Sequence, residues 1–485
     1  MLQSANDNRR ACIGLFAVGH APYWAQFPGL KEQLLRYHAK VYDKLTALGV
    51  EVLDIGMVDS SQAAYHAAQQ LRAGNLDLVF ADMVTYATSS VFAPILRDSG
   101  LPLVLLALQP RSALDYTQAS TRMQLENDNI CSVPEFMNVA LRYGRPIYDV
   151  VIGTLENDPA ADQEIAGWCA VARALHGLKG ARLGLMGHVL EAMYDMHADP
   201  TALSVAFGIH IPLLEIDDLL AESQAVSQEE IQTKAEEILS CFDTPDPQSD
   251  PITTKLTEAD LMASARSAAA LDRFVARHQL TGLAYYYGGL EGSPQRALAS
   301  SLIVGNTLLN ARGIPMCGEY DIKTCLAMLL MDRLGIGGSF AELHPFDFSD
   351  DIILLGHDGP HHMAIAQGKP VLRSLTRFHG KPGHGASVEF KIKEGPITLL
   401  GITQKRDGEF KFIIGEGSSN AGPIPPTGNT NTRARFAPST RSFVKSWVME
   451  GPTHHLALGI GHHGRDLVHL AKVLGVDYAF VGGDQ

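Results

Sequence analysis

The stretch CIGLFAVG, residues 12–19, opens the alternation that decides the fold of the N-terminal part of the chain. A short apolar run of this kind is typical of a buried strand. Residues 29–49 follow, with apolar side chains at helical spacing and a glycine at the end. The alternation continues through 50–58, 60–74, 76–84, 91–100 and 101–109. This rhythm predicts an open parallel sheet with helices on both faces.

A second unit with the same rhythm begins near Lys179. We expect strands at 179–190, 208–216 and 280–289, and helices that begin near Glu229 and Glu258. A single long helix is expected over 293–313. The second unit is therefore also predicted to be of the α/β class.

After about Phe340 the rhythm changes to strands separated by Gly, Pro and Asp turns, which indicates an antiparallel unit. The expected strands cover 351–357, 388–404, 408–417 and 442–451, followed by a helix and a final strand in 464–481. We predict an α/β protein of three domains. Residues 1–180 and 181–338 would form two Rossmann-like or flavodoxin-like parallel-sheet domains, and residues 339–485 an antiparallel, β-barrel-like domain with a terminal helix.

Composition excludes several classes of protein. With 46% hydrophobic and 19% charged residues, the 485-residue chain has the balance of an ordinary globular protein. Its net charge of -14 argues against nucleic acid or an anionic membrane as a partner. It has no transmembrane-length apolar run, no apolar signal-peptide core in its first ten residues and no CxxC pair among six scattered cysteines. We therefore expect a cytoplasmic protein with reduced thiols.

Two segments place carboxylates and an imidazole at abrupt structural boundaries. In CGEYDIKT, residues 317–324, Glu319 precedes a helix, where a carboxylate can simply complement the helix dipole. In SFAELHPFDFSDDIILLGH, residues 339–357, Glu342 lies among apolar residues and His357 ends a strand. Strand ends commonly carry ligand-binding side chains. A solvated carboxylate and a polar strand end explain this second segment equally well.

Four of the 19 histidines fall in MEGPTHHLALGIGHHG, residues 449–464. Adjacent side chains of an extended segment point to opposite faces, so at most one of His454 and His455 should face a given site. His462 and His463 lie between glycines before the last helix, and we expect them in a solvated turn. Two glutamates and two histidines would suit Mn²⁺, Co²⁺ or Zn²⁺, although they form no local motif here.

Three runs resemble the L-arabinose isomerase family in order and separation: GEYDIKTCLAM (318–328), SFAELHPFDFSDDIILLGH (339–357) and PTHHLALGIG (452–461). The N-terminal half agrees in outline, through LPLVLLALQP (101–110) and IAGWCAVARALHGLKGARLGLMG (165–187). Members of this family and the related L-fucose isomerases interconvert aldoses and ketoses with a divalent metal, usually Mn²⁺. The resemblance implies a metal-dependent isomerase of the L-arabinose to L-ribulose type, acting on a pentose or 6-deoxyhexose through a cis-enediol. It also implies a homo-oligomer, a hexamer or tetramer.

The resemblance assigns roles to eight residues. The implied metal ligands are Glu319, Glu342, His357 and His455, and the two glutamates would also be the catalytic acid–base pair. The implied substrate-binding residues are His454, Asp321, Phe340 and Leu190.

The chain departs from the family around this core. Pro360 replaces a glutamate that normally follows the metal-binding histidine, and residues 187–201 add the polar side chains of Tyr194, Asp195 and His197. The identity of the sugar is therefore left open. Two other functions are compatible with the sequence: a non-catalytic sugar-binding protein, which two α/β units also suit, and a metal-dependent sugar epimerase or hydrolase on the same scaffold.

Overall fold

The computed structural model describes residues 10–378 and 385–482. Residues 1–9, to which the signal-peptide prediction refers, lie outside this part. The chain divides at residue 176 into two units, which are described separately. The further division of the second unit at residue 338 stays a prediction. None of the helices in the described ranges has the length and apolar character needed to cross a membrane.

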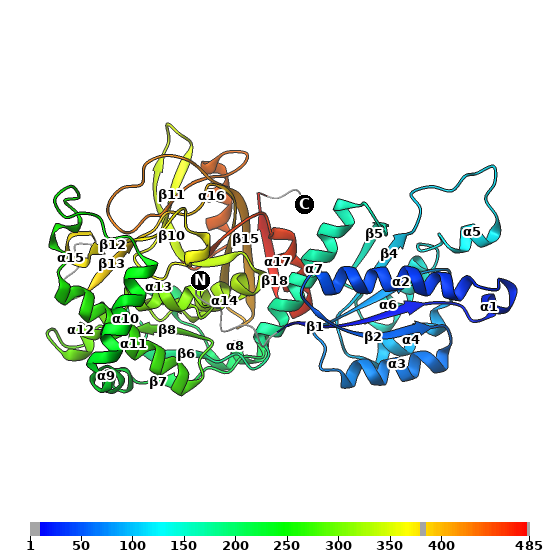
Figure 1. The fold of residues 1–485 in the computed structure, drawn as a ribbon, viewed down its shortest axis with the longest axis horizontal. Coiled ribbons are helices and arrows are strands. Elements are labelled where there is room, and N and C mark those ends of the chain that lie inside the picture. The colour runs from blue at the N-terminus through cyan, green and yellow to red at the C-terminus, as the bar shows by residue number, and fades with distance from the viewer. Residues whose placement is uncertain (1–9, 379–384, 483–485) are drawn as a thin grey trace. The chain divides into compact units, whose positions relative to one another are not determined.

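The first unit is built on a parallel five-stranded sheet of order β2-β1-β3-β4-β5. Its strands are β1 (Cys12–Val18), β2 (Glu51–Val58), β3 (Leu78–Met83), β4 (Leu103–Gln109) and β5 (Asp149–Thr154). Its helices are α1 (Pro22–Gln26), α2 (Leu30–Ala47), α3 (Ser61–Ala73), α4 (Ala93–Asp98), α5 (Thr121–Leu125), α6 (Val133–Tyr143) and α7 (Pro159–Leu178). Helix α2 lies on one face of the sheet, and α3 and α4 lie on the other (Figure 1). This confirms the predicted open sheet.

The second unit begins with a parallel sheet of order β7-β6-β8-β9. Its strands are β6 (Leu183–Gly187), β7 (Leu213–Leu214), β8 (Gly282–Tyr286) and β9 (Met316–Cys317). The helices are α8 (Pro200–Phe207), α9 (Ile216–Ala225), α10 (Gln228–Cys241), α11 (Glu258–His278), α12 (Pro294–Ser300), α13 (Ile303–Ala311) and α14 (Ile322–Leu334).

The long helix predicted over 293–313 is wrong, because the structure has α12 and α13 there. The break falls at Ser301, whose hydroxyl donates to the Leu298 carbonyl and whose amide donates to the same oxygen. A serine that bonds local backbone in this way competes with helical hydrogen bonding.

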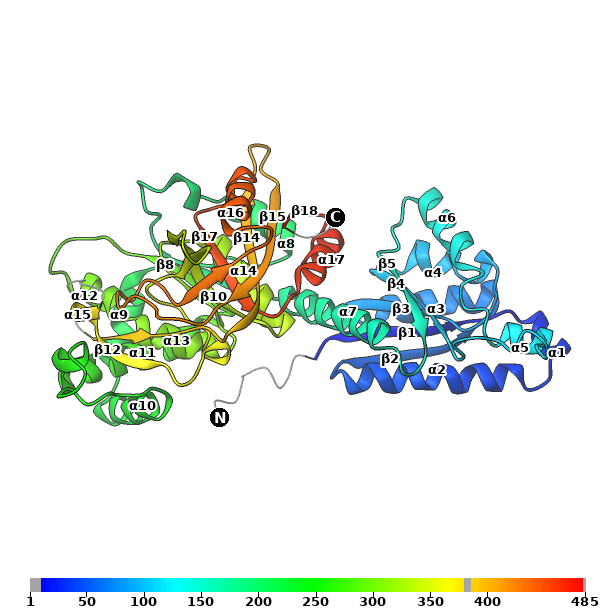
Figure 2. The same cartoon turned by 90° about the horizontal axis from the view of Figure 1, so that it is seen from above.

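A closed antiparallel barrel follows. Its strands are β10 (Gly337–Asp347), β11 (Ile352–Gly356), β14 (Gly395–Gln404), β15 (Phe410–Ser419), β16 (Thr432–Arg435) and β17 (His455–Ile460). They pair in the order β14-β17-β10-β11-β16-β15, and β14 pairs back with β15. Strand β18 (Asp477–Val481) extends the sheet in parallel to β15. The separate pair β12 (Val371–Ser374) and β13 (Ala386–Glu389) and the helices α15 (Leu375–Phe378) and α17 (Gly464–Leu474) complete the unit (Figure 2).

The strand predicted over 442–451 is also wrong, because residues Thr440–Met449 form helix α16. Its buried side chains include Phe443, Val444 and Trp447, which recur at helical spacing. The Ser439 hydroxyl accepts a hydrogen bond from the Ser442 amide and caps the helix.

Helix α14, whose start lies directly after Glu319, is buried along most of its length. It contacts β10, β14 and β17 of the barrel and also β6 and β8 of the sheet, and it lies between the two layers (Figure 1). Every side chain from Ile322 to Met331 is buried. Asp321 caps its start, and Gly335 ends it in the left-handed conformation. Because α14 is enclosed, groups at its start are held in a rigid setting.

Candidate metal centre

Glu319 lies in a strained turn between β9 and α14. Glu319 and Tyr320 have φ angles of 54° and 64°, and left-handed backbone costs a non-glycine residue on the order of 1–2 kcal/mol. The turn is held by two hydrogen bonds, from the Tyr320 amide to the Tyr285 carbonyl (3.0 Å) and from the Asp321 amide to the Gly318 carbonyl (3.1 Å). The carboxylate therefore precedes the helix and does not belong to its first turn, so the helix-dipole interpretation of Glu319 is not supported.

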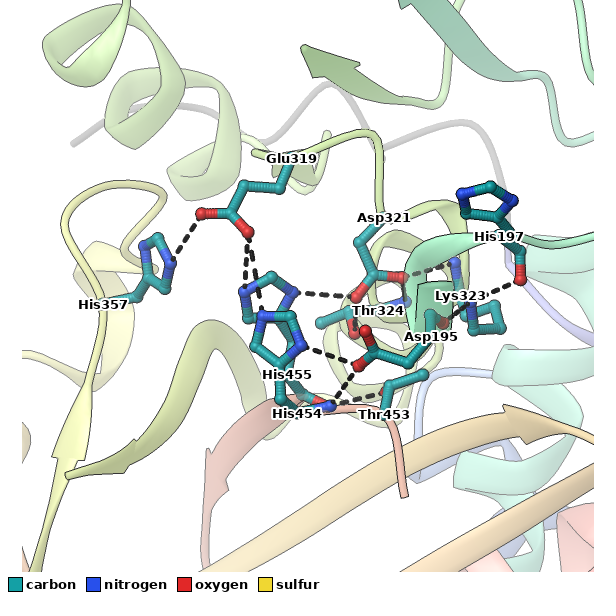
Figure 3. Close-up of polar contacts among 10 residues, drawn as sticks. All are labelled: Asp195, His197, Glu319, Asp321, Lys323, Thr324, His357, Thr453, His454 and His455. Atoms are coloured by element: carbon teal, nitrogen blue, oxygen red, sulfur yellow. Dashed lines mark hydrogen bonds and ion pairs between the residues drawn. The ribbon is translucent and has the colours of Figure 1, made fainter. Parts of the chain in front are cut away.

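Three imidazoles converge on the Glu319 carboxylate. Its Oε1 lies 3.8 Å from His357 Nε2, and its Oε2 lies 3.6 Å from His455 Nε2 and 3.7 Å from His454 Nε2. Figure 3 shows the carboxylate between His357 on one side and the His454–His455 pair on the other. The three nitrogen atoms thus face the same carboxylate, His357 at one oxygen and the histidine pair at the other.

Each of these imidazoles has an aspartate at its other ring nitrogen. Asp321 Oδ2 lies 3.1 Å from His455 Nδ1, and Asp195 Oδ2 lies 2.7 Å from His454 Nδ1. The third aspartate, Asp358, has Oδ1 at 2.8 Å from the Nδ1 of the adjacent His357. Metal-binding histidines usually have a hydrogen-bonded carboxylate, as His455 and His454 do, which fixes the ring and leaves Nε2 for the ion. The arrangement is therefore typical of a metal site.

Glu342 completes the predicted set through strand pairing. On β10 it lies opposite His455 of β17 and also opposite Gly356 of β11, directly before His357. Donor atoms of Glu342, His357 and His455 all lie within 4.8 Å of one another, as do those of Glu319, His454 and His455. The structure thus brings Glu319, Glu342, His357 and His455 together, and their role as ligands stays a prediction.

Buried atoms at the centre need a partner that the described residues do not supply. Glu319 Oε2 and His455 Nε2 are both buried and have no hydrogen-bond partner among those residues. Burial would raise the pKa of Glu319, but His454, His455 and His357 lower it below its ordinary value. Burial lowers the pKa of His455 despite the opposing effect of Asp321. A carboxylate and a neutral imidazole with free lone pairs suit a divalent cation.

The expectation that His454 and His455 face opposite sides is wrong. Their ring centroids are 3.9 Å apart, and both Nε2 atoms approach the same oxygen of Glu319. His454 lies in a bend just before β17 begins, so the alternation of an extended strand does not apply to it. Its closeness to Glu319, and then to Asp195, raises the pKa of His454 to about 9.

The second histidine pair lies where the sequence predicted. His462 and His463 precede α17 in an irregular segment. His462 Nε2 lies 3.0 Å from the Gly417 carbonyl oxygen, and His463 Nδ1 lies 2.8 Å from Asp466 Oδ2. The structure therefore does not place them among the groups of metal-binding donors.

The other predicted substrate-binding residues have different surroundings. Asp321 is fully buried and accepts hydrogen bonds from the Lys323 and Thr324 amides, so it supports the helix and His455. Phe340 is buried, with its ring centroid 4.5 Å from that of His357 and 4.3 Å from that of His455. Leu190 is half-buried in the loop after β6 and is not among the residues lining either cavity beside the centre.

Two cavities flank the centre. One of about 260 Å³ borders Glu319 and His357 and is lined by Tyr285, Tyr286, Tyr287, Arg296, Ser300 and Asn306, among others. The other, of about 290 Å³, borders Glu342 and His454. Both volumes lie just below the roughly 300–1,000 Å³ range of sites for drug-sized molecules, which suits a ligand as small as a monosaccharide.

Sequence reasoning missed two supporting residues, Lys323 and Asp358. Lys323 is 1% exposed, and its Nζ donates to the carbonyls of Asp195 (2.9 Å) and His197 (3.4 Å). A lysine in the otherwise apolar run of α14 was the available signal, because a buried ammonium needs specific partners. The signal for Asp358 was an aspartate directly after a candidate metal-binding histidine.

In comparisons with known proteins, the chain is similar to sugar isomerases. Residues 372–481 match the family model described as L-fucose isomerase, C-terminal domain. L-arabinose isomerase of Nocardioides sp. is 25% identical over 417 residues, covering 84% of this chain and 80% of that protein. L-arabinose isomerase 1 of Bacillus licheniformis is 22% identical, with 83% and 80% covered, and L-arabinose isomerase of Yersinia pestis is 22% identical, with 70% and 68% covered. The similarity thus spans most of the chain at low identity.

Proposed function

Because the chain is a distant homologue of the L-arabinose isomerases over most of its length, we propose that it is a metal-dependent aldose–ketose isomerase. The proposed substrate is a pentose or 6-deoxyhexose, in a reaction of the L-arabinose to L-ribulose type. The observation that carries the proposal is the convergence of Glu319, Glu342, His357 and His455 beside a cavity.

The reaction moves two protons. One leaves C2 of the aldose and is delivered to C1, through a cis-enediol, and another passes between the two oxygens. A divalent ion, Mn²⁺ in our proposal, would supply electrophilic polarisation of the sugar oxygens. Glu319 and Glu342 are the proposed acid–base pair, one serving the carbon-bound proton and the other the oxygen-bound proton.

The chain's own groups suit these tasks. The pKa of Glu319 is held below its ordinary value by the adjacent histidines, although burial opposes this, so at neutral pH Glu319 is a carboxylate able to accept a proton. Phe340 packs against His357 and His455 and covers the centre with an apolar ring. Tyrosine, serine and asparagine side chains in the adjoining cavity offer hydrogen bonds and aromatic surface to sugar hydroxyls.

A panel of aldoses, assayed for ketose formation with added Mn²⁺, tests the proposal. Glu319→Gln and Glu342→Gln should abolish turnover with the fold intact, because each nearly isosteric change removes an anionic ligand and a proton acceptor. Activity above about a tenth of wild type in both variants would exclude these roles. Solvent deuterium appearing at sugar C1 or C2 would separate isomerisation from hydrolysis. A non-catalytic sugar-binding protein would bind sugar and form no ketose.

Two further properties stay predictions. We propose a homo-oligomer, a hexamer or tetramer, which light scattering on the purified chain would measure. We also propose a cytoplasmic location. The net charge of -14 supports the absence of nucleic acid and anionic membrane among its partners.

A further inference from the structure

The second imidazole of the pair provides a donor beyond the four predicted ligands. We propose that in the sugar-free protein His454 is a fifth protein ligand of the same metal centre, at a position that a sugar oxygen would take on binding, and that Asp195 is its supporting carboxylate. The inference rests on the metal centre of the proposed function, but it concerns ion binding and can be tested without turnover.

His454 lies as close to the Glu319 carboxylate as the other two imidazoles do. Its Nε2 lies 3.7 Å from Glu319 Oε2, against 3.6 Å for His455 and 3.8 Å from Oε1 for His357. Two donors that each lie about 2.1 Å from one ion are roughly 3.0–3.4 Å apart at right or tetrahedral angles. A contraction of a few tenths of an ångström would bring each nitrogen atom to the spacing from a Glu319 oxygen that two ligands of one ion have, and His454 shares its group of donors with Glu319 and His455.

The orientation of His454 is set in the same manner as that of His455. Asp195 Oδ2 lies 2.7 Å from the His454 ring Nδ1 and also accepts a hydrogen bond from the His454 backbone amide (3.0 Å). With Nδ1 engaged by a carboxylate, the Nε2 lone pair remains for an ion. Asp321 engages Nδ1 of His455 in the same way. Figure 3 shows the two aspartates on the same side of the paired rings.

A buried lysine anchors this arrangement to α14. Lys323, 1% exposed, donates from Nζ to the carbonyl of Asp195 and, at 3.4 Å, to that of His197. Burying an ammonium group is unfavourable unless it is hydrogen-bonded, so this placement is a specific feature of the fold. The start of one helix therefore supports both imidazoles, His455 through Asp321 and His454 through Lys323 and Asp195.

A third imidazole changes the metal that the site favours. Two carboxylates and two imidazoles suit Mn²⁺, whereas each added nitrogen ligand shifts the preference towards Co²⁺, Ni²⁺ or Zn²⁺. We therefore expect this chain to bind Co²⁺ more tightly than Mn²⁺, with His454 responsible for part of the difference.

The test is titration of the metal-free full chain with Co²⁺ and Mn²⁺ by calorimetry, together with the visible absorption of bound Co²⁺, which reports its coordination. His454→Ala should weaken Co²⁺ binding at least tenfold, weaken Mn²⁺ binding less, and alter the Co²⁺ spectrum. Asp195→Asn, which leaves the imidazole in place, should weaken Co²⁺ binding by about 10- to 100-fold. His462→Ala is the matched control and should bind both ions as the wild type does, because its imidazole lies against the Gly417 carbonyl.

Wild-type affinities and an unchanged Co²⁺ spectrum in His454→Ala would overturn the inference, whether or not the wild type isomerises a sugar. Equal losses for Co²⁺ and Mn²⁺ would overturn the shift in preference. Absence of stoichiometric metal in the wild type would instead remove the metal centre on which the proposed function depends. Circular dichroism of each variant ensures that a lost affinity is not a lost fold.

Discussion

Asp321→Asn should separate folding from metal binding at the centre. The Asp321 Oδ1 atom accepts hydrogen bonds from the Lys323 and Thr324 amides, both at 3.1 Å. Because both backbone amides need an acceptor, an asparagine at this position should place its side-chain oxygen where Oδ1 is in the wild type. Its NH₂ group would then replace Oδ2 and donate to Nδ1 of His455, which is 3.1 Å away in the wild type. The proton of His455 would be forced onto Nε2, the atom that faces Glu319.

The two effects have different sizes. Asparagine caps a helix as well as aspartate does, but the Thr324 hydroxyl, which donates to Asp321 Oδ2 at 2.6 Å, would lose this acceptor, so the free energy of unfolding should fall by about 1 kcal/mol. Loss of a supporting carboxylate typically weakens metal binding by about 10- to 100-fold, or about 1.4–2.7 kcal/mol, and the wrong tautomer should place this variant at or beyond the upper value. Asp321→Ala also removes the cap, about 1 kcal/mol, and leaves the buried His455 nitrogen unpaired, about 1–3 kcal/mol. Together with the lost hydrogen bond from Thr324, we expect Asp321→Ala to be destabilised by about 3–5 kcal/mol.

Calorimetric titration with Mn²⁺ and urea unfolding of the metal-free full chain measure the two quantities. The reasoning is refuted if Asp321→Asn binds Mn²⁺ within a factor of about three of wild type while the KM for sugar rises. In that case Asp321 contacts the substrate, as the family resemblance implies, and does not act through His455.

Three other predictions follow from the structure. EDTA should inactivate the enzyme, and added Mn²⁺ should restore its activity. Full activity in EDTA-treated protein that contains no metal by elemental analysis would exclude a metal from the mechanism. Burial alone would lower the pKa of His38, but Asp54 and Asp82 raise it to about 9. The protonated imidazole therefore stabilises the fold fully below pH 6.5, and this contribution disappears as the pH rises through 9. Between pH 6.5 and 9 the free energy of unfolding, measured in urea, should therefore fall by on the order of 3 kcal/mol in the wild type and not in His38→Gln. The same pH dependence of this free energy in both proteins would contradict the prediction. Replacing His462 and His463 together by Ala should leave the metal content unchanged and lower the free energy of unfolding by about 1 kcal/mol or less, and loss of metal would place the wrong histidine pair at the centre.

Local patterns in the sequence were sufficient for most of the architecture. The strand over 12–18 and the helix over 30–47 follow from apolar periodicity and a terminal glycine, which are properties of neighbouring residues. The same reasoning failed at 440–449, where apolar residues fit a helix better than the predicted strand, and at Ser301, where a side chain breaks a helix. Both failures depend on one or two local hydrogen bonds and on what the segment packs against.

The sequence by itself, through resemblance to a family, determined which four donors to consider, and the structure decided how they meet. Glu342 faces His455 because β10 and β17 pair in one register, and His357 joins them because β11 pairs on the other side of β10. The orientation of His455 depends on Asp321, 134 positions away. Only the tertiary structure showed that His454 lies on the same side as His455. His454 is in a bend before β17, so the alternation of side chains between the two faces of a strand does not apply to it. Strand register and bends of this kind arise from packing between distant segments, and short-range patterns do not encode them.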